Sequence, residues 1–290
     1  MSKKRIIIFG GAGMLGSVFC DAMKDCYDIT SLSKNDADIR DFVSVLTQIS
    51  MHEPEVVLNF AAMTDVEWAE TNSRLDAFEI NALGAQNVAK AAWAFGIPLV
   101  HLSSDYVFDW ENEWGYASDD TPKPINNYWL SKFLGEELIK REYSDAIVVR
   151  TSALYGGPIF GELWAKVHFI NKILEKKRRW ESLCVIDDQF TLPTSCRDLC
   201  QALGELIENI ESYEWKILHL VCENNSLEHV SWYDFITEAK KYLPLLWEIK
   251  PISISDYESR VQRPKYGILK NTCSIKLPDW REWLSKYLRK

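Results

Sequence analysis

Apolar runs of strand length alternate with segments of helical periodicity through the first half of the chain. The run RIIIFG (5–10) precedes GAGMLGSVFCDAMKD (11–25), whose apolar residues recur at helical spacing. Further strands are predicted at 27–33, 55–62, 98–104 and 146–156, and further helices at 41–50, 76–95 and 128–140. Because each strand is apolar throughout and is followed by a helix, the pattern predicts a parallel sheet covered on both faces.

The alternation becomes less regular after Tyr155. Helical patterns near 162–176, 198–210 and 231–242, short strands at 183–187 and 216–221, and an amphipathic helix in 277–290 predict a second, interleaved lobe. We expect a doubly wound parallel Rossmann sheet in 1–155 plus roughly 188–222. A smaller α/β substrate-binding lobe is expected in roughly 156–187 and 223–290.

Composition excludes several classes of protein. The net charge is −9, from 42 acidic and 33 basic residues, and the one short basic run is KKRR at 176–179, so nucleic acid is not expected as the main partner. No apolar run approaches the ~20 residues of a membrane span, which leads us to expect a cytoplasmic protein. Seven cysteines without a CxxC pair indicate reduced core thiols. Cys196 and Cys200 are predicted to share a helical face as structural thiols, and no metal site is expected.

The first predicted turn has the glycine spacing of a dinucleotide site. GGAGMLG fits both Gly11-x-Gly13-x-x-Gly16 and Gly10-x-x-Gly13-x-x-Gly16. Between a strand and a helix, such glycines let the backbone approach a pyrophosphate at the helix N-terminus. We predict a dinucleotide at this turn, with a purely structural turn as the alternative.

The end of the second predicted strand indicates which cofactor binds. An acid at this position usually binds the ribose hydroxyls of NAD, but this strand ends in Ser33 and Lys34. A hydroxyl and a cation favour a 2'-phosphate, so NADPH is predicted. NADH stays open, because Lys34 could point into water or Asp36 could take the ribose. Asp38 and Ile39 are placed to flank the adenine.

Tyr128 and Lys132 stand four residues apart in YWLSK and would lie on one face of a helix. Taken alone, such a pair is an exposed aromatic ring and a solvated cation. Ser104 ends a parallel strand, however, at the edge where ligands of this architecture bind. We therefore predict carbonyl reduction, in which Tyr128 protonates the oxygen, Ser104 holds it, and Lys132 lowers the tyrosine pKa and binds the nicotinamide ribose. His101 alternates away from Ser104 and is interpreted as structural.

A family resemblance extends over nearly the whole chain. The motifs GxxGxxG (10–16), NFAAMTDVEWAE (59–70), AFEINALGAQNVAKAA (77–92), VHLSSDYVFD (100–109), YWLSK (128–132), VVRTS (148–152), DQFTLPTSCRDL (188–199) and RPKYGIL (263–269) occur in the order found in extended short-chain dehydrogenases. Within that superfamily the chain resembles the dTDP-4-dehydrorhamnose reductase family.

The resemblance implies functional positions and partners. It gives the catalytic positions to Ser104, Tyr128 and Lys132, and has Asn81 support the catalytic helix. It adds Ala61, Ala62 and Met63 to the cofactor positions predicted from the residues, so that the full set is Gly10, Gly13, Met14, Leu15, Gly16, Ser33, Lys34, Asp38, Ile39, Ala61, Ala62, Met63, Tyr128 and Lys132. The positions for a nucleotide-sugar substrate are Thr64, Val66, Ser104, Asp105, Tyr106, Ala153 and Arg263. Homodimers occur in the family.

Several pocket positions depart from the family pattern. Trp129 stands where relatives commonly have glycine, Ala153 where they have tryptophan, and Ser104 where they favour threonine. The RPxxS motif has become RPKYG at 263–267. The small Ala153 leaves space for a larger sugar substituent unless Trp129 fills it. We therefore hypothesise a sugar other than, or broader than, the dTDP-rhamnose precursor, such as one bearing an acetamido group.

The leading functional prediction is NAD(P)H-dependent reduction of the 4-keto group of a nucleotide-linked 4-keto-6-deoxy sugar, in cell-surface polysaccharide synthesis. The alternative is a non-catalytic NADP-binding subunit that resembles the regulatory subunit of methionine adenosyltransferase. An epimerase or dehydratase is less well supported, because no Glu stands beside the Ser104 or Tyr128 motif as an extra acid or base.

Overall fold

The computed structural model describes residues 2–71, 74–157, 182–213, 216–224, 229–243, 248–257, 261 and 265–289. The helix predicted near 162–176 and the basic run at 176–179 lie outside these ranges. Within them, no helix has both the length and the apolar content that crossing a bilayer requires.

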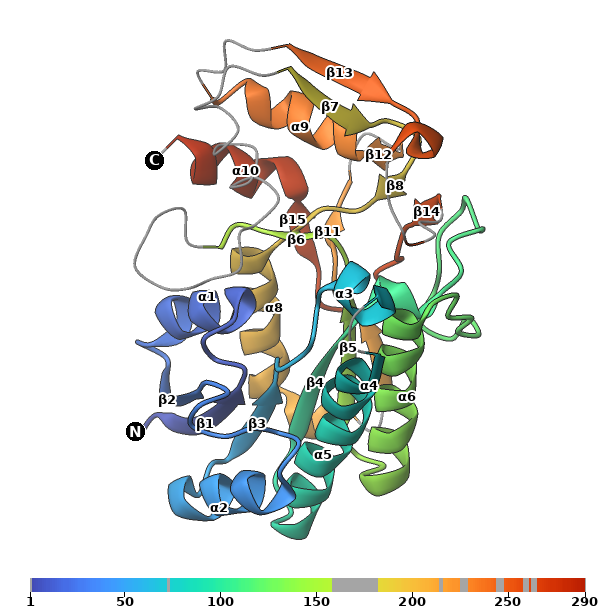
Figure 1. The fold of residues 1–290 in the computed structure, drawn as a ribbon. Helices are drawn as coiled ribbons and strands as arrows, with labels where there is room; N and C mark the ends of the chain where they lie inside the picture. Colours follow the sequence, from blue (N-terminus) through green and yellow to red (C-terminus); the bar gives the residue numbers. More distant parts are fainter. Residues whose placement is uncertain are drawn as a thin grey trace.

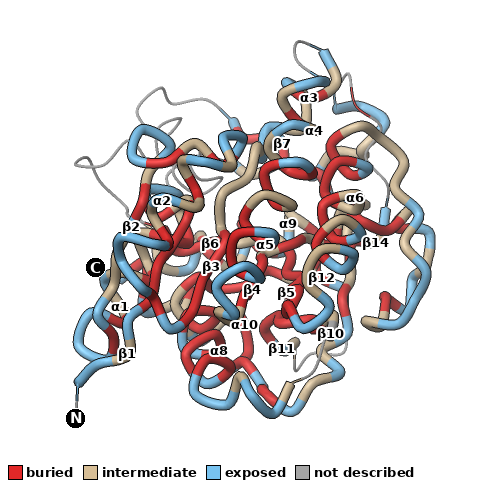
Figure 2. The backbone as a smooth tube through the Cα atoms, turned by 90° about the horizontal axis from the view of Figure 1, so that it is seen from below, coloured by how far each residue is buried: buried red, intermediate tan, exposed pale blue. Residues whose placement is uncertain are grey.

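A six-stranded parallel sheet forms the centre of the molecule (Figure 1). Its strands are β1 (Lys4–Phe9), β2 (Tyr27–Leu32), β3 (Val56–Asn59), β4 (Leu99–Ser104), β5 (Ile147–Thr151) and β10 (Lys216–His219), in the order β10-β5-β4-β3-β1-β2. β3 and β5 are buried along their whole length (Figure 2). The chain moves outward from β1 to β2 and then returns to β3 on the other side of β1, so the topological switch point lies between β1 and β3. The predicted fold class is confirmed.

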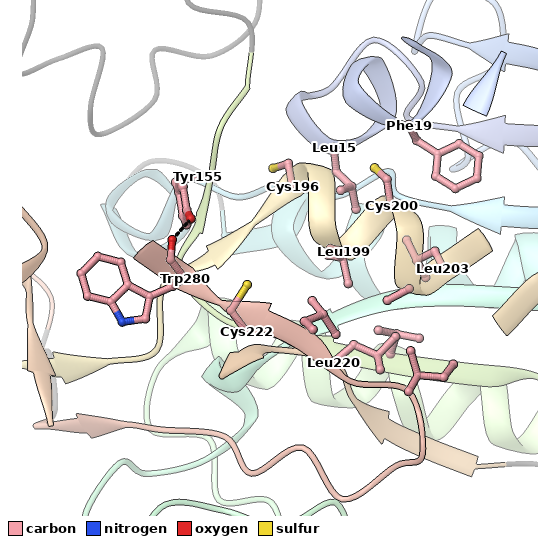
Figure 3. Packing of buried hydrophobic residues seen from close by; sticks show 14 of the residues in the cluster. Leu15, Phe19, Tyr155, Cys196, Leu199, Cys200, Leu203, Leu220, Cys222 and Trp280 are labelled. Atoms are coloured by element: carbon pink, nitrogen blue, oxygen red, sulfur yellow. Dashed lines mark hydrogen bonds between the residues drawn. The ribbon is translucent and has the colours of Figure 1, made fainter. Parts of the chain in front are cut away.

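Helices cover both faces of this sheet (Figure 1). One face carries α1 (Met14–Met23) and α8 (Cys196–Glu208), and the other carries α2 (Phe42–His52), α5 (Ala85–Ala94) and α6 (Asn127–Glu142). Under α1 and α8, Leu15 and Phe19 pack with Leu203 in one hydrophobic core (Figure 3). Cys196 and Cys200 are buried in the same core, and burial raises the pKa of both thiols. They therefore stay protonated, as structural thiols do.

The helix predicted over 76–95 is interrupted in the structure. α4 (Arg74–Phe78) leads into a π-helical turn, Glu79–Gly84, before α5 begins. The buried Asn81 lies in this wider turn. Hydrophobic periodicity did not predict the turn, because a π-turn displaces the pattern by about one residue. The preceding helix α3 (Val66–Thr71) is too short to show an amphipathic pattern and was not predicted.

Short strands build the smaller sheets, which lie beyond the carboxyl end of the main sheet (Figure 1). Three of these sheets are pairs of strands: β6 (Leu154–Tyr155) with β9 (Thr194–Ser195), β7 (Leu183–Ile186) with β13 (Ile249–Ile252), and β11 (Cys222–Glu223) with β15 (Leu277–Asp279). The fourth has three strands, in which β8 (Phe190–Thr191) lies between β12 (Val230–Ser231) and β14 (Tyr266–Gly267). The helical elements of this part are α9 (Trp232–Lys240), α10 (Trp280–Leu288) and the 3-10 turn Ile254–Asp256, whereas the 3-10 turn Ile210–Ser212 connects α8 to β10. Tyr155 donates its hydroxyl hydrogen to the Trp280 carbonyl oxygen, which attaches α10 to the end of β6 (Figure 3). The predicted domain boundaries stay a prediction.

Helix α6 is attached to the sheet by buried polar contacts. Glu136 of α6 accepts two hydrogen bonds from Arg150 of β5, at 2.6 and 3.0 Å, and both side chains are 1% exposed. Gly135 lets α6 approach the π-helical turn closely, since a Cβ atom at this position would lie 2.2 Å from the Asn81 carbonyl oxygen. The position of α6 is therefore fixed from two sides.

We expect Gly135→Ala to lower the free energy of unfolding by about 1–3 kcal/mol, because the new methyl group forces α6 away from the π-helical turn. Gly204→Ala in α8 is the matched control: its Cβ would lie 3.5 Å from the nearest atom, an ordinary contact. Replacing that helical glycine should raise the free energy of unfolding, by up to about 1 kcal/mol. Urea unfolding measures both effects, and a stable Gly135→Ala variant would contradict the close approach.

Candidate active site

The glycine turn leads from β1 into α1 and packs against the segment that follows β3. Gly10 has φ +83°, and a Cβ atom on it would lie 2.5 Å from the backbone nitrogen of Ala61. A Cβ atom on Gly16 would lie 2.6 Å from the Gly10 carbonyl oxygen. These glycines are therefore required by packing at the switch point, where open α/β sheets bind their ligands.

The start of α1 offers backbone donors at the same place. The N-cap residue is Gly13, which has no side chain to accept hydrogen bonds from the first turn. The N–H groups of Met14, Leu15 and Gly16 are therefore available to an anion at the positive end of the helix dipole. The Leu15 side chain belongs to the core, so this residue can serve a ligand through its backbone. The turn fits the pyrophosphate of a dinucleotide.

The rim beyond β2 contains a hydrogen-bonded turn that was not predicted. The Ser33 N–H and hydroxyl both donate to Asp36 Oδ2, at 2.8 and 2.6 Å. These bonds lower the pKa of the Asp36 carboxyl. Lys34 is exposed beside them. The contacts of Ser33 and Lys34 with a 2'-phosphate stay a prediction, and Ser33 must exchange its bond to Asp36 to make one.

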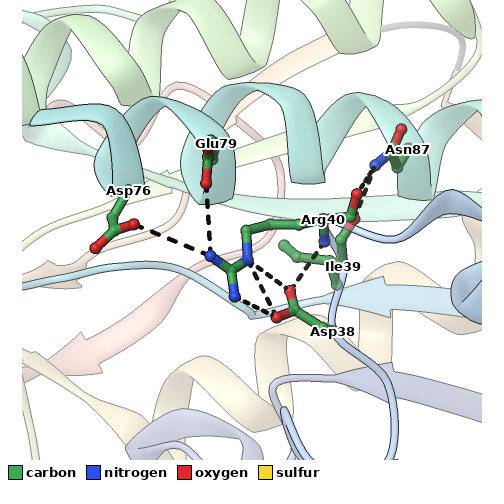
Figure 4. A network of polar contacts seen from close by, with 6 residues as sticks. All are labelled: Asp38, Ile39, Arg40, Asp76, Glu79 and Asn87. Carbon is green, nitrogen blue, oxygen red and sulfur yellow. Dashed lines mark hydrogen bonds and ion pairs between the residues drawn. The ribbon is translucent and has the colours of Figure 1, made fainter. Parts of the chain in front are cut away.

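Arg40 organises the loop after β2. It was not predicted as a site residue, although its position between Asp38 and Asp41 in DIRD indicates an ion pair. Its guanidinium donates to both Asp38 carboxylate oxygens, with a shortest distance of 2.6 Å, and lies 3.5 Å from Glu79 and 4.0 Å from Asp76 (Figure 4). This hydrogen bonding lowers the pKa of Asp38. Arg40 thus holds the carboxylate of Asp38 against the π-helical turn.

Ile39 is held from the other side of the same loop. The Asn87 side chain donates to the Ile39 and Arg40 carbonyl oxygens, at 2.9 and 3.1 Å (Figure 4). Ile39 is buried, and a Cβ atom on Gly84 would lie 2.7 Å from its Cδ1. The Ile39 side chain therefore belongs to the core, and its contact with adenine, like that of Asp38, stays a prediction.

The loop after β3 is fixed by Asn81. The Met63 N–H donates to Asn81 Oδ1 at 2.9 Å, and Asn81 Nδ2 donates to the Met63 carbonyl oxygen at 3.1 Å. Asn81 Nδ2 also donates to Ser131 Oγ of α6, at 3.0 Å. Asn81 therefore supports α6, the helix that contains the predicted catalytic residues Tyr128 and Lys132. Around Met63, the predicted cofactor residues Ala61 and Ala62 and the predicted substrate residue Val66 are half-buried, and Thr64 is exposed.

Ser104 ends β4 and caps the 3-10 turn Asp105–Val107. Its Oγ accepts from the Tyr106 N–H at 3.2 Å and donates to Asp105 Oδ1 at 2.8 Å. Asp105 is 3% exposed, and burial raises the pKa of its carboxyl to about 7. The single hydroxyl hydrogen of Ser104 therefore points to a carboxyl group that changes charge near neutrality.

The three predicted catalytic residues converge at the carboxyl end of β4. Lys132 Nζ donates to the Leu102 carbonyl oxygen at 2.9 Å, two residues before Ser104. The Tyr128 ring lies edge to face with the Tyr106 ring, with 5.6 Å between ring centroids. The Tyr106 N–H also donates to Ser104 Oγ, so Tyr106 contacts both Tyr128 and Ser104.

One electrostatic prediction is wrong. The pKa of Tyr128 lies above its usual value, because burial raises it most and Tyr106 and Asp105 add to the effect. Tyr128 is 4% exposed, and the Lys132 ammonium is directed at the Leu102 carbonyl oxygen. Burial lowers the pKa of Lys132 itself to about 8. The phenol therefore keeps its proton near neutrality, so it has a proton to donate but is a weaker acid than a free tyrosine.

Trp129 supports the site from inside the core. Tyr106 stacks on Trp110 and on Trp129, with ring centroids 5.0 and 5.1 Å apart. Trp129 is 1% exposed. A buried indole cannot cover a sugar, so Trp129 does not replace the tryptophan that relatives have at position 153.

Ala153 follows β5 in an unusual conformation. Its φ of +41° lies in the left-handed region, which is uncommon for a residue with a side chain. Its carbonyl oxygen accepts from the Thr194 N–H at 3.3 Å, and the residue is half-buried. The other predicted substrate residue of this region, Arg263, lies outside the described residues.

His101 lies in the interior. Its Nδ1 is 3.1 Å from Asn59 Nδ2, and it is fully buried. Burial, with a smaller contribution from the Lys132 charge, holds the pKa of His101 well below its usual value, so the ring stays neutral. In the part of the chain that the structure describes, no three His, Cys, Asp or Glu residues gather as metal ligands.

Known proteins are similar to this chain in sequence and in fold. A family model described as the RmlD substrate binding domain matches residues 4–290. The spore coat polysaccharide biosynthesis protein SpsK of Bacillus subtilis is 31% identical, over 98% of this chain and 97% of its own length. A dTDP-4-keto-6-deoxy-D-glucose reductase of Streptomyces niveus is 30% identical, over 96% of this chain and 90% of its own length.

A solved structure is similar over its full length. The dTDP-4-dehydrorhamnose reductase of Bacillus anthracis, in complex with NADP, superimposes with a TM-score of 0.89 at 30% identity, and 98% of each chain is covered.

We expect Asp105→Asn to change how stability depends on pH. The carboxyl has a pKa of about 7 in the folded protein and about 4 in the unfolded chain, so the folded state binds more protons between these values. The free energy of unfolding of the parent should therefore fall as pH rises from 4 to 7 and then stay at the lower value. The variant has no carboxyl at position 105 and should lack this decrease.

The measurement is the Tm of parent and Asp105→Asn at pH 5 and pH 8. The gain in Tm from the substitution should be larger at pH 8. Asp36→Asn is the control, because the pKa of that exposed carboxyl is lowered and no gain at pH 8 is expected. The same gain at both pH values would show that Asp105 does not titrate in this range.

Proposed function

The chain belongs to the family described as the RmlD substrate binding domain, and we propose that it reduces the 4-keto group of a nucleotide-linked 4-keto-6-deoxy sugar with NADPH. The observation that carries the proposal is the convergence of Ser104, Tyr128 and Lys132 at the carboxyl end of β4. The relatives named as dTDP-sugar reductases support the substrate class. The spore coat protein supports a role in polysaccharide synthesis.

NADPH is supported from two directions. The uncapped start of α1 and the close-packed Gly10 and Gly16 suit a dinucleotide pyrophosphate. The similar reductase of Bacillus anthracis is in complex with NADP. Ser33 and Lys34 would hold the 2'-phosphate, and NADH stays the alternative cofactor.

The reaction assigns one task to each catalytic side chain. When bound, the nicotinamide supplies hydride to the carbonyl carbon. Tyr128 gives its phenolic proton to the oxygen, and burial keeps that proton in place before the reaction. Ser104 donates a hydrogen bond to the same oxygen once its hydroxyl turns from Asp105. Lys132 has the task of binding the nicotinamide ribose.

The non-catalytic binding subunit is not favoured. Ser104, Tyr128 and Lys132, the proposed catalytic residues, are all present, and similar proteins from Streptomyces niveus and Bacillus anthracis are named as reductases. We place the reaction in the cytoplasm, because both expected substrates are soluble metabolites. A homodimer, which the family resemblance allows, stays a prediction.

Tyr128→Phe tests the proposal directly. The change removes the proton donor and leaves the buried ring in place, so kcat should fall by roughly 10²-fold or more. Steady-state oxidation of NADPH with a dTDP-linked 4-keto-6-deoxy sugar measures kcat, and fluorescence titration measures NADPH affinity, which should persist. Activity within threefold of the parent would remove Tyr128 from the mechanism.

Ala153→Trp tests sugar selection. The indole should cover the sugar and shift preference toward the plain 6-deoxyhexose over one with an acetamido group. One altered apolar contact changes discrimination by about 10- to 200-fold. The readout is the ratio of kcat/KM for the two sugars. Ala153→Ser, which adds little volume, is the control and should keep the parent ratio; an unmoved ratio in Ala153→Trp would show that position 153 does not select the sugar.

A further inference from the structure

The first turn of α6 is held by a carboxylate from a distant part of the chain. Glu70 lies near the end of α3 and is half-buried. Its Oε1 accepts from the Asn127 N–H at 2.5 Å and from the Tyr128 N–H at 3.3 Å, and its Oε2 accepts from Asn127 Nδ2 at 2.7 Å. The backbone of the proposed proton donor is therefore bonded directly to Glu70.

Glu70 is not the only cap of this helix. The N-cap residue Asn126 accepts from the Trp129 N–H through Oδ1, at 2.9 Å, and from the Leu130 N–H through its carbonyl oxygen, at 2.9 Å. Glu70 thus takes the two remaining N–H groups of the first turn, including that of Tyr128. Asn126 alone satisfies the usual capping requirement of a helix, so Glu70 adds a connection to another element.

The Tyr128 backbone is held at its other end as well. The Ser131 hydroxyl donates to the Tyr128 carbonyl oxygen at 2.7 Å, and Ser131 Oγ accepts from Asn81 Nδ2. Asn81 also fixes Met63, at the start of the loop that leads into α3. Tyr128 is therefore attached, through Glu70 and Asn81, to both ends of the segment that contains the predicted substrate residues Thr64 and Val66.

We propose that Glu70 is a positioning residue for Tyr128, which fixes the first turn of α6 against α3 so that the phenol meets the substrate carbonyl oxygen. The inference rests on the proposed reductase function. A displacement of a reacting group by about 1 Å costs on the order of 10²-fold in rate. Loss of Glu70 should therefore slow the chemical step while substrate and cofactor still bind.

The kinetic test compares Glu70→Ala with Glu70→Gln. Glu70→Ala should lower kcat by roughly 10- to 100-fold and leave the KM for the nucleotide sugar and the Kd for NADPH within about threefold. Glu70→Gln keeps an oxygen that accepts from both backbone N–H groups, and kcat should return to within about fivefold of the parent. Asp41→Ala removes the exposed cap of α2, which accepts from the Val43 N–H, and should leave kcat unchanged.

A double variant shows whether Glu70 acts through Tyr128. In the Tyr128→Phe background, Glu70→Ala should lower the remaining kcat by less than about threefold, because the proton donor is already absent. An equal loss in both backgrounds would overturn the proposal, as would a kcat for Glu70→Ala within threefold of the parent.

Hydrogen exchange tests the positioning without any substrate. The Asn127 and Tyr128 amides should exchange at least 10-fold faster in Glu70→Ala than in the parent or in Asp41→Ala, and Glu70→Gln should restore their protection. Unchanged exchange in Glu70→Ala would overturn the proposal. A parent enzyme without turnover would contradict the reductase function, and the exchange rates would still decide whether Glu70 fixes this turn.

Discussion

The buried ion pair between Glu136 and Arg150 fixes α6 on the sheet, and the active-site arrangement depends on it. Both side chains are 1% exposed, so removing either partner would leave an uncompensated charge in the interior at a cost of about 3–5 kcal/mol. Lys132 and Tyr128 stand four and eight residues before Glu136, on the same face of the helix. The contact that holds the helix therefore also sets the depth at which the ammonium and the phenol reach the end of β4.

The same burial decides the charge states of the site. Desolvation favours the neutral forms of Tyr128 and Asp105 and brings the pKa of Lys132 to about 8. The proposed mechanism needs the phenol of Tyr128 protonated before hydride arrives, and burial favours this form. The Ser104 hydroxyl donates to Asp105, whose carboxyl has a pKa of about 7, so the hydroxyl proposed to bind the substrate oxygen contacts a group that titrates near neutrality.

The sequence predicted the features that follow from local spacing. Strand and helix periodicity, the glycine turn at Gly10–Gly16 and the four-residue step from Tyr128 to Lys132 each map onto one element. The sheet, the turn and the helix that contains Tyr128 and Lys132 were therefore predicted correctly, and the catalytic roles of these two residues stay predictions. Contacts between segments that are far apart in the sequence could not be predicted from it. Glu70 and Asn127 are 57 residues apart, Arg40 and Glu79 are 39 apart, and no spacing rule connects them. The raised pKa of Tyr128 depends on burial, which a pattern of residue types does not measure.

The most direct test of carbonyl reduction is the fate of the transferred hydrogen. The parent enzyme would be supplied with NADPH deuterated at the transferred position of the nicotinamide ring and with a dTDP-linked 4-keto-6-deoxy sugar. NMR and mass spectrometry of the product should show one deuterium, bonded to C4 of the sugar, for each NADPH oxidised. A product without deuterium, or with deuterium at another carbon, would contradict reduction of the 4-keto group by this protein.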